Sequence, residues 1–345
     1  MSNKIRVGIT HGDINGISYE VLLKVLEDAR LCDLCTIVVY GSAKIANFYR
    51  KAMDLPQVQF NQIEDAAEAR ADAFNMINVV PEDTRLDPGE STEVGGQAAF
   101  AALEAAVSDL RQDKIDVLVT APINKHNIQS DTFHFPGHTE YLEASLAEDG
   151  EKALMILCND EVRVALVTTH VPMAQLSAAI TRESILERLE IFDRSLRRDF
   201  RVHSPRIAVL SLNPHAGENG LLGTEEQETI IPAIQEAQEK KILAFGPYAA
   251  DGFFGSGAYK AFDGILAMYH DQGLAPFKAL AMNEGINYTA GLPYVRTSPD
   301  HGTGYDITGK GMASPDSMRN AIYMAVDIFR NRRSEDEAHS NPLKK

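Results

Sequence analysis

The chain has 345 residues, with 33 Lys and Arg against 49 Asp and Glu, so its formal net charge at pH 7 is −16. A surface this acidic disfavours general electrostatic binding of nucleic acid, and no basic amphipathic stretch points to a membrane surface. The sequence also lacks an apolar run of about 18–20 residues and a signal-peptide core. We therefore expect a cytoplasmic globular protein with one large α/β unit or two subdomains.

Short β-rich runs alternate with longer helical patterns. In chain order, the predicted strands are Ile5–Thr10, Cys35–Tyr40, Ile115–Thr120, Ala153–Cys158, Val162–Thr168, Arg206–Leu212 and Gly264–Met268. The clearest predicted helices are Tyr19–Leu26, Gly96–Leu110, Arg182–Arg198 and Glu225–Lys240. Near-continuous apolar strands separated by helices predict a mostly parallel, doubly wound sheet.

The middle of the chain departs from this pattern. Only Asn159–Glu161 separates two of the predicted strands, and this spacing predicts a hairpin with antiparallel pairing. From about Ala121 to Arg201, the hairpin and a long helix suggest an inserted or second subdomain. At the other end, the highly charged residues 331–345 predict a frayed tail.

Cys32 and Cys35 form a C-x-x-C pair, which suits a redox pair or half of a zinc site. No second C-x-x-C exists, and Cys158 lies in an apolar run. We therefore interpret all three cysteines as structural thiols.

Three predicted strands are each followed by a histidine: His170, His215 and His270. Ligands of open α/β sheets bind outside the carboxyl ends of the strands, so these side chains can meet at one point. Three imidazoles with an open fourth position are typical of a catalytic zinc-type site.

A single histidine after a strand is more often a capping or hydrogen-bonding residue than a metal ligand. The three are 45 and 55 residues apart in sequence, too far for a local motif, so a shared site depends on the fold. His11 and His126 also follow strands. The pattern alone therefore leaves the ligand set open.

Polar groups suited to an anion occur in two further segments. His138 and Thr139 lie beside a turn ahead of a predicted helix, whose N-terminus favours anions. Lys278, Asn287 and Arg296 follow in a stretch otherwise poor in positive charge. These residues predict a site for a small phosphorylated or carboxylated substrate, with ordinary surface cations as the alternative.

A glycine-rich loop, residues 297–304, follows Arg296 and allows close backbone approach to a cofactor. It is not a G-x-G-x-x-G motif, and none follows the first strand, where Gly12–Gly16 stands instead. The residues by themselves argue against a typical Rossmann dinucleotide site.

Six ordered motifs together resemble the 4-hydroxythreonine-4-phosphate dehydrogenase (PdxA) family. They are Thr120–Lys125, Pro136–Glu140, Asn213–Glu218, Gly223–Glu226, Ala267–Gly273 and Arg296–Thr303. The resemblance extends over nearly the whole chain, from about Ile5 to Ile328.

The resemblance implies oxidation of 4-phosphooxy-L-threonine with NAD or NADP. The product loses CO2 to give 3-amino-2-oxopropyl phosphate, on the way to pyridoxal 5′-phosphate. It also implies a divalent metal (Zn, Mg or Co) and an isocitrate/isopropylmalate dehydrogenase-like α/β fold with a mostly parallel sheet. On this basis residues 1–345 form a single catalytic unit of two interleaved α/β subdomains with the active site between them, in a homodimer whose active site lies at the subunit interface.

By motif, the resemblance makes three histidines the metal ligands, with His270 of the partner subunit completing the set: His170, His215 and His270. It excludes His11 and His126. The substrate-binding residues that it implies are His138, Thr139, Lys278, Asn287 and Arg296.

The general base is not visible in the motifs. Asp251 and Asp271 lie near the metal motifs and are both candidates. Each could equally orient a metal-ligating histidine through a hydrogen bond.

The segment Gly12–Glu20 departs from the family pattern. It reads G-D-I-N-G-I-S-Y-E where the family usually has G-D-P-A-G-I-G-P-E. The departure bears on the local loop shape and on substrate preference. Two rival functions remain. A related dehydrogenase of phosphorylated sugar acids, such as 4-phospho-erythronate or 4-phospho-threonate, would share the metal and phosphate residues, and a non-catalytic phosphate-ligand binder could have the same fold. Retention of all three histidines speaks against the binder.

Overall fold

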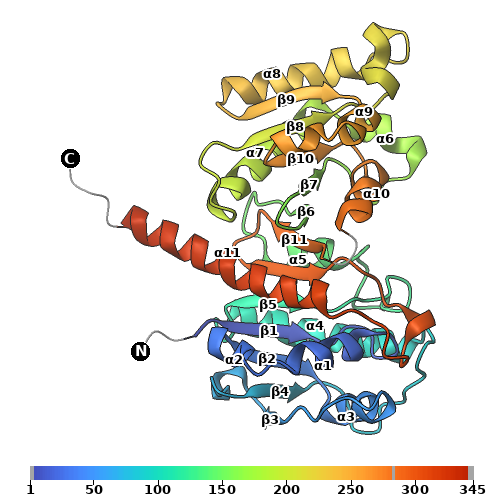
Figure 1. The fold of residues 1–345 in the computed structure, drawn as a ribbon, viewed down its shortest axis with the longest axis vertical. Coiled ribbons are helices and arrows are strands. Elements are labelled where there is room, and N and C mark those ends of the chain that lie inside the picture. The colour runs from blue at the N-terminus through green and yellow to red at the C-terminus, as the bar shows by residue number, and fades with distance from the viewer. Residues whose placement is uncertain (1–3, 282–283, 341–345) are drawn as a thin grey trace. The chain divides into compact units, whose positions relative to one another are not determined.

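The computed structural model describes residues 4–281 and 284–340 (Figure 1). The chain divides into two compact units: the first comprises Met1–Gly150 and Leu292–Phe329, and the second comprises Glu151–Gly291 and Arg330–Lys345. Residues 121–150, which the sequence grouped with the hairpin, therefore belong to the first unit. The second unit extends well past Arg201, the expected end of the inserted segment.

The first unit contains parallel strands in the order β3-β4-β2-β1-β5-β12. These strands are β1 (Arg6–Thr10), β2 (Thr36–Gly41), β3 (Phe60–Ile63), β4 (Phe74–Asn78), β5 (Val117–Thr120) and β12 (Val295–Pro299). The helices are α1 (Ser18–Leu26), α2 (Leu31–Leu34), α3 (Ala43–Ala52), η1 (Ala66–Glu68), α4 (Glu93–Arg111), α5 (His138–Leu146) and η6 (Tyr305–Ile307), and the long helix α11 (Asp316–Ser340) begins here.

The second unit has strands in the order β11-β6-β7-β10-β8-β9. They are β6 (Leu154–Cys158), β7 (Arg163–Leu166), β8 (Arg206–Leu210), β9 (Leu243–Tyr248), β10 (Gly264–Ala267) and β11 (Ile286–Ala290). The pairs β11–β6 and β6–β7 are antiparallel and the remaining pairs are parallel, which confirms the predicted hairpin and the mostly parallel sheet. The helices are η2 (Met173–Gln175), α6 (Leu176–Ala179), α7 (Arg182–Arg198), η3 (Pro214–Gly220), the π-helical η4 (Glu226–Ile230), α8 (Ile231–Glu239), α9 (Ala250–Gly255), η5 (Ala258–Ala261) and α10 (His270–Ala281).

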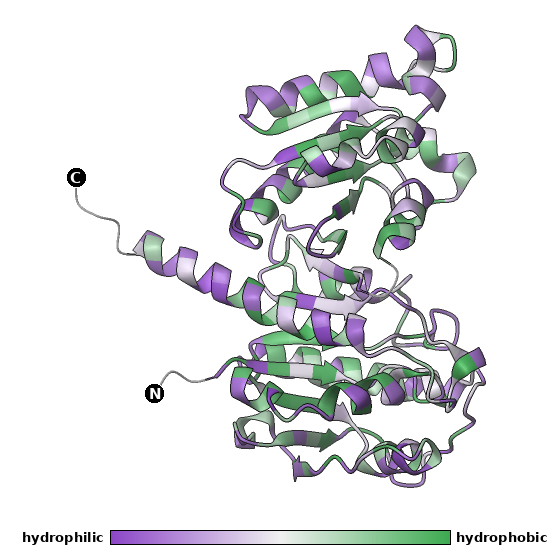
Figure 2. Ribbon diagram, in the orientation of Figure 1, coloured by the Kyte–Doolittle hydropathy of each residue, from purple (hydrophilic) through white to green (hydrophobic). Residues whose placement is uncertain are grey.

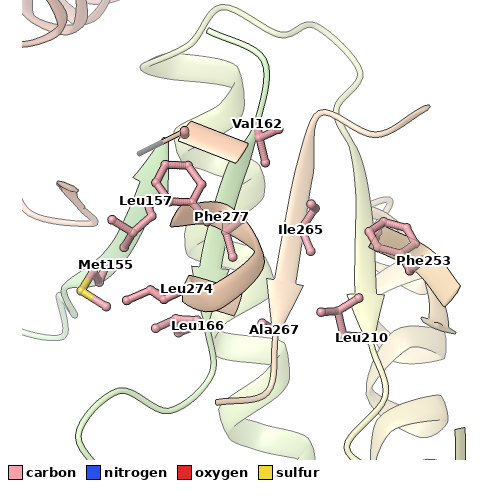
Figure 3. Packing of buried hydrophobic residues seen from close by; sticks show 13 residues of the cluster. Met155, Leu157, Val162, Leu166, Leu210, Phe253, Ile265, Ala267, Leu274 and Phe277 are labelled. Atoms are coloured by element: carbon pink, nitrogen blue, oxygen red, sulfur yellow. The ribbon is translucent and has the colours of Figure 1, made fainter. Parts of the chain in front are cut away.

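Hydrophobic residues make up much of the strands in both units, as the hydropathy colouring of Figure 2 shows. In the second unit, a buried cluster joins side chains of β7, β8 and β10 to Leu274 and Phe277 of α10 (Figure 3). Phe277 is fully buried. Removing such side chains from water stabilises the unit by about 1.5–3 kcal/mol each. The packing holds the helix that begins at His270 against the strands that precede His170 and His215.

The prediction of a frayed tail after Arg330 is wrong for residues 331–340, which continue helix α11. Hydrophilic residues dominate this part of the helix in Figure 2, as the sequence indicated. The end of the helix is nevertheless held, because Arg332 is buried and its Nε lies 2.7 Å from Oδ1 of Asp199. Residues 341–345 lie outside the described part of the chain. No helix in the described part is long and apolar enough to cross a membrane.

Candidate active site

The three predicted ligand histidines follow neighbouring parallel strands of the second unit. Strand β10 pairs with both β7 and β8 in parallel, so the carboxyl ends of all three lie at one edge of the sheet. His170 follows β7, His215 follows β8, and His270 is the first residue of α10 after β10. The three strands therefore have the parallel arrangement on which the prediction of a shared histidine site depends.

One chain does not assemble the three-histidine set. The rings of His170 and His270 have centroids 6.1 Å apart. Over residues 4–281 and 284–340, however, no three His, Cys, Asp or Glu side chains form a group that could hold a metal ion. A shared sheet edge brings these histidines into one region of the second unit without converging them on a point.

Asp271 directly orients one of these histidines. Its Oδ1 lies 2.7 Å from Nδ1 of His270. A carboxylate at Nδ1 favours the tautomer with the proton on Nδ1 and leaves Nε2 as the lone-pair donor, the arrangement that metal-ligating histidines normally have. Of the two roles that the sequence left open for Asp271, this contact supports the orienting one.

His215 stands on a left-handed turn. Five consecutive residues, 215–219, have φ between 43° and 76°. A left-handed conformation costs about 1–2 kcal/mol for each residue other than glycine. Among the five, Gly217 escapes this cost and Asn219 tolerates the conformation better than the other three. Strain of this kind persists where surrounding contacts impose it and is concentrated at functional sites.

A pocket of about 520 Å³ opens beside this turn. Its lining includes His215, Asp251 of α9, Phe254, Tyr269 and Gln272, all in the second unit. A few convergent polar groups on a largely apolar wall are typical of a small-molecule site. Of the two candidate bases, Asp251 is the one that lines this pocket.

The second unit also carries two predicted substrate residues. Asn287 lies on β11, and its Oδ1 is buried with no hydrogen-bond partner among the residues that the structure describes. A buried acceptor of this kind calls for a donor, which a bound substrate could supply. Lys278 is exposed in the last turn of α10.

The other predicted substrate residues, His138, Thr139 and Arg296, belong to the first unit. Arg296 of β12 is 2% exposed, and its Nη2 and Nε donate to Oγ1 of Thr120 at 2.6 and 3.1 Å. Burial lowers the pKa of Arg296 to about 9, which leaves it charged at pH 7. His138 begins α5, with Thr139 next to it, and its Nε2 is buried with no hydrogen-bond partner in the described part of the chain.

Electrostatics around His138 explain its protonation state. Burial, followed by the charges of Arg296 and Lys125, lowers the pKa of His138 well below 6.5. The imidazole is therefore neutral at pH 7 and its Nε2 can accept or donate according to tautomer. A buried guanidinium beside the amino end of a helix suits an anionic group.

The altered segment Gly12–Glu20 has its own hydrogen-bond network. Asn15 Nδ2 donates to Thr92 Oγ1 at 2.8 Å, and the Asp87 backbone N–H donates to Asn15 Oδ1 at 2.9 Å. The Tyr19 hydroxyl lies 2.8 Å from Nδ1 of His11. Two of the residues that depart from the family pattern are thus built into the packing of the first unit.

The same network shows that His11 is not placed to bind a metal ion. Its Nε2 lies 3.0 Å from the Ala98 carbonyl oxygen, so both ring nitrogens are occupied. Burial lowers the pKa of His11 to about 4. The neutral ring is a core hydrogen-bonding residue, in agreement with its exclusion by the motifs.

A family model described as "Pyridoxal phosphate biosynthetic protein PdxA" matches residues 33–325. The chain belongs to the PdxA family. It is 58% identical over 343 residues to a 4-hydroxythreonine-4-phosphate dehydrogenase of Bacteroides thetaiotaomicron, covering 99% of this chain and 94% of the relative. A relative from Oceanobacillus iheyensis, provisionally named D-threonate 4-phosphate dehydrogenase, is 38% identical, covering 95% of this chain and 99% of its own.

Solved structures agree with this assignment. A 4-hydroxythreonine-4-phosphate dehydrogenase from Klebsiella pneumoniae has a TM-score of 0.80 at 33% identity, covering 95% of this chain and 100% of that one. An isocitrate dehydrogenase from Methylococcus capsulatus, with a TM-score of 0.50 at 11% identity, covers 97% of this chain and 89% of that one and shows the fold alone. The predicted fold class is confirmed.

Lys125 of this PdxA chain belongs to a family motif that by itself assigns it no role. Lys125 ends the motif Thr120–Lys125, and its charge contributes to the lowered pKa of His138. Partial burial lowers the pKa of Lys125 itself, while the carboxylate of Glu140 opposes the shift. The motif contains Lys125, but only the structure shows that its charge acts on His138.

Proposed function

We propose that this PdxA-family chain oxidises the hydroxyl-bearing carbon of 4-phosphooxy-L-threonine with NAD, giving 2-amino-3-oxo-4-phosphooxybutanoate, NADH and a proton. This β-keto acid then loses CO2, and a proton replaces the lost carboxylate to give 3-amino-2-oxopropyl phosphate, a step in pyridoxal 5′-phosphate biosynthesis. The observation that carries the proposal is 58% identity over 99% of the chain to a relative named for this reaction.

The substrate phosphate needs positive charge and hydrogen-bond donors. We assign substrate binding to the residues that the motifs imply, His138, Thr139, Lys278, Asn287 and Arg296. The buried Arg296 guanidinium and the amino end of α5 support the assignment in the first unit. We add Lys125, because its charge acts on His138.

The three histidines fit a divalent ion by donor chemistry. Neutral imidazole suits Zn²⁺ or Co²⁺, and Asp271 holds His270 in the orientation that a ligand requires. A bound divalent ion (Zn, Mg or Co) supplies Lewis-acid polarisation of the reacting oxygen, which favours both oxidation and loss of CO2. Mg²⁺ is the weakest fit, because it prefers oxygen ligands.

Proton transfer falls to a carboxylate of the second unit. In this proposal Asp251, which lines the pocket beside His215, accepts the proton of the substrate hydroxyl as hydride leaves the carbon that bears this hydroxyl. Asp271 keeps the orienting role, since its carboxylate lies against His270. NAD or NADP supplies the hydride acceptor.

The substrate assignment has one rival with a specific observation behind it. The Oceanobacillus iheyensis relative is provisionally named for D-threonate 4-phosphate, a phosphorylated sugar acid. Its identity to this chain is 38%, compared with 58% for the relative named for the threonine derivative. The higher identity favours the amino acid substrate.

An assay of NADH formation decides between the two. With Zn²⁺, Mg²⁺ or Co²⁺ present, we expect kcat/KM for 4-phosphooxy-L-threonine to exceed that for D-threonate 4-phosphate by about tenfold or more, because a site that binds the amino group rejects an analogue without it. The reverse order would establish the sugar-acid activity. Rescue of a pyridoxine auxotroph by the gene provides the matching test in cells.

We also propose that the active enzyme is a homodimer in which His270 of the partner subunit joins His170 and His215. The support is that one chain does not form a three-ligand group in its described residues. Two-fold dimers are the commonest oligomers of soluble proteins.

Mixing two inactive variants tests this arrangement. If ligands come from two subunits, co-refolding His170→Ala with His270→Ala restores about one quarter of wild-type activity, because half of the dimers are mixed and each has one intact site. If all three ligands came from one chain, no mixture would regain activity. His203→Ala mixed with wild type controls for the refolding yield, since His203 is exposed and precedes β8, whereas the predicted ligands follow the strands.

We place this activity in the cytoplasm. Cys32, Cys35 and Cys158 are thiols, as a reducing compartment permits. The net charge of −16 supports a small-molecule partner rather than nucleic acid.

A further inference from the structure

We infer that Glu226 is a positioning residue that holds the left-handed turn carrying His215. The inference rests on the proposed function, in which His215 binds the metal ion. Glu226 has no role in the motif-based assignments, yet it is 1% exposed and begins the π-helical segment η4. Segments of π-helix occur frequently at functional sites.

The Glu226 carboxylate binds the segment just before His215. Its Oε1 accepts the backbone N–H of Leu212 at 2.8 Å and of Asn213 at 2.7 Å. Its Oε2 accepts from Nδ2 of Asn213 at 3.0 Å. Both oxygens are therefore committed to two residues that precede the turn by no more than three positions.

The same carboxylate also contacts the inside of the turn. A Cβ atom placed on Gly217 would lie 2.7 Å from Oε2 of Glu226 and 2.9 Å from the Gly223 carbonyl oxygen. Gly217 has φ of 76°, so it is suited to this position both by its conformation and by its lack of a side chain. Glu226 thus touches the entry and the middle of the turn.

The Glu226 carboxylate interacts with the loop before His215 and not with a cationic side chain of the described residues. In the described part of the chain, no Lys or Arg forms an ion pair with it, and its hydrogen bonds come from Leu212 and Asn213. Successive backbone N–H groups that converge on a carboxylate form an anion-binding concavity. In this loop the anion is the carboxylate of Glu226 itself. The left-handed backbone that follows presents His215 beside the pocket.

Two replacements and a matched control test the role. Glu226→Ala removes all three acceptor contacts, whereas Glu226→Gln keeps the Oε1 acceptor and the side-chain volume. Glu228→Ala removes an exposed carboxylate from the same π-helical segment. The measurements are Zn²⁺ affinity by titration calorimetry and hydrogen exchange of the 212–220 backbone, both on the full-length protein without substrate.

We expect Glu226→Ala to bind Zn²⁺ about 10–100-fold more weakly than wild type, the effect of losing support behind a metal ligand. Exchange at Leu212 and Asn213 should rise in parallel, Glu226→Gln should be intermediate, and Glu228→Ala should match wild type. An Ala variant that folds with wild-type exchange and affinity overturns the inference.

Failure of this inference differs from failure of the proposed function. A wild-type protein that binds Zn²⁺ but does not oxidise 4-phosphooxy-L-threonine refutes the substrate and leaves Glu226 in its role. A wild-type protein that binds no Zn²⁺ refutes the ligand role of His215 and this inference with it. If Glu226→Ala does not fold, Glu226→Gln decides, because unchanged affinity and exchange in that variant count against the role.

Discussion

Replacing His215 by alanine should reduce the rate of NADH formation by about a thousandfold, because the loss of Lewis-acid stabilisation raises the free energy of the transition state by roughly 4 kcal/mol. The free energy of unfolding should change little, since His215 is exposed and alanine meets the same left-handed strain. Metal content, measured by atomic emission on the purified variant, should fall in step with activity.

Chelation provides the reversible form of the same experiment. Wild-type protein treated with a chelator should lose turnover and recover it when Zn²⁺ or Co²⁺ is restored. His203→Ala should leave both metal content and rate unchanged, because His203 is exposed and follows no predicted ligand strand. Turnover that survives complete metal removal would refute the metal mechanism, and an unchanged metal content in the His215 variant would refute the ligand assignment.

The second large effect is expected at Arg332, where alanine should lower the free energy of unfolding by about 3–5 kcal/mol. Arg332 is 7% exposed, and its partner Asp199 is 2% exposed. Asp199 also accepts from Oγ of Ser195 and from the Tyr288 hydroxyl, each at 2.6 Å. Removing the guanidinium leaves a buried carboxylate without its cation, and this uncompensated charge is the source of the cost.

Arg333→Ala is the matched control for this substitution. Arg333 pairs with Glu337 across one turn of the same helix, with side chains 64% and 66% exposed. An exposed pair of this kind contributes at most about 1 kcal/mol. Equal urea midpoints for the two variants would contradict the role of the buried network, as would unchanged hydrogen exchange at residues 331–340 in Arg332→Ala.

The phenol of Tyr288 should remain a donor in this network across the usable pH range. Burial and then the Asp199 carboxylate raise the pKa of Tyr288 well above 10. Tyr288→Phe should therefore lower the free energy of unfolding by less than Arg332→Ala does, because it removes two hydrogen bonds, one to Asp199 and one from Arg332, and leaves the ion pair in place.

The apolar strands were readable from the sequence because they are buried on both faces. Strands β7, β8 and β10 appear as near-continuous hydrophobic runs, and the histidines that follow them were identified from this pattern. Strands β11 and β12 were not predicted, because polar residues interrupt them. In β12, the buried Arg296 donates N–H groups to Thr120 of β5, a partner that the local sequence does not indicate.

The motifs also determined the family, with its implied ligand and substrate residues, since long ordered motifs are specific even where secondary structure is ambiguous. They assigned no role to Lys125 or Glu226. The effect of Lys125 is its charge on His138, and the role inferred for Glu226 depends on backbone N–H groups of Leu212 and Asn213. Residue types do not show which backbone N–H groups a side chain will contact, because every residue except proline carries one.

The end of α11 shows most clearly what could not be predicted from the sequence. Charge density after Arg330 predicted fraying, because a charged segment by itself cannot bury enough surface to offset its ordering entropy. Asp199, far away in sequence, reverses that outcome for Arg332. The sequence by itself determined the family, the apolar strands and the identity of the candidate residues. Tertiary structure decided which polar residues are buried, because burial of a charge depends on partners that sequence proximity does not supply.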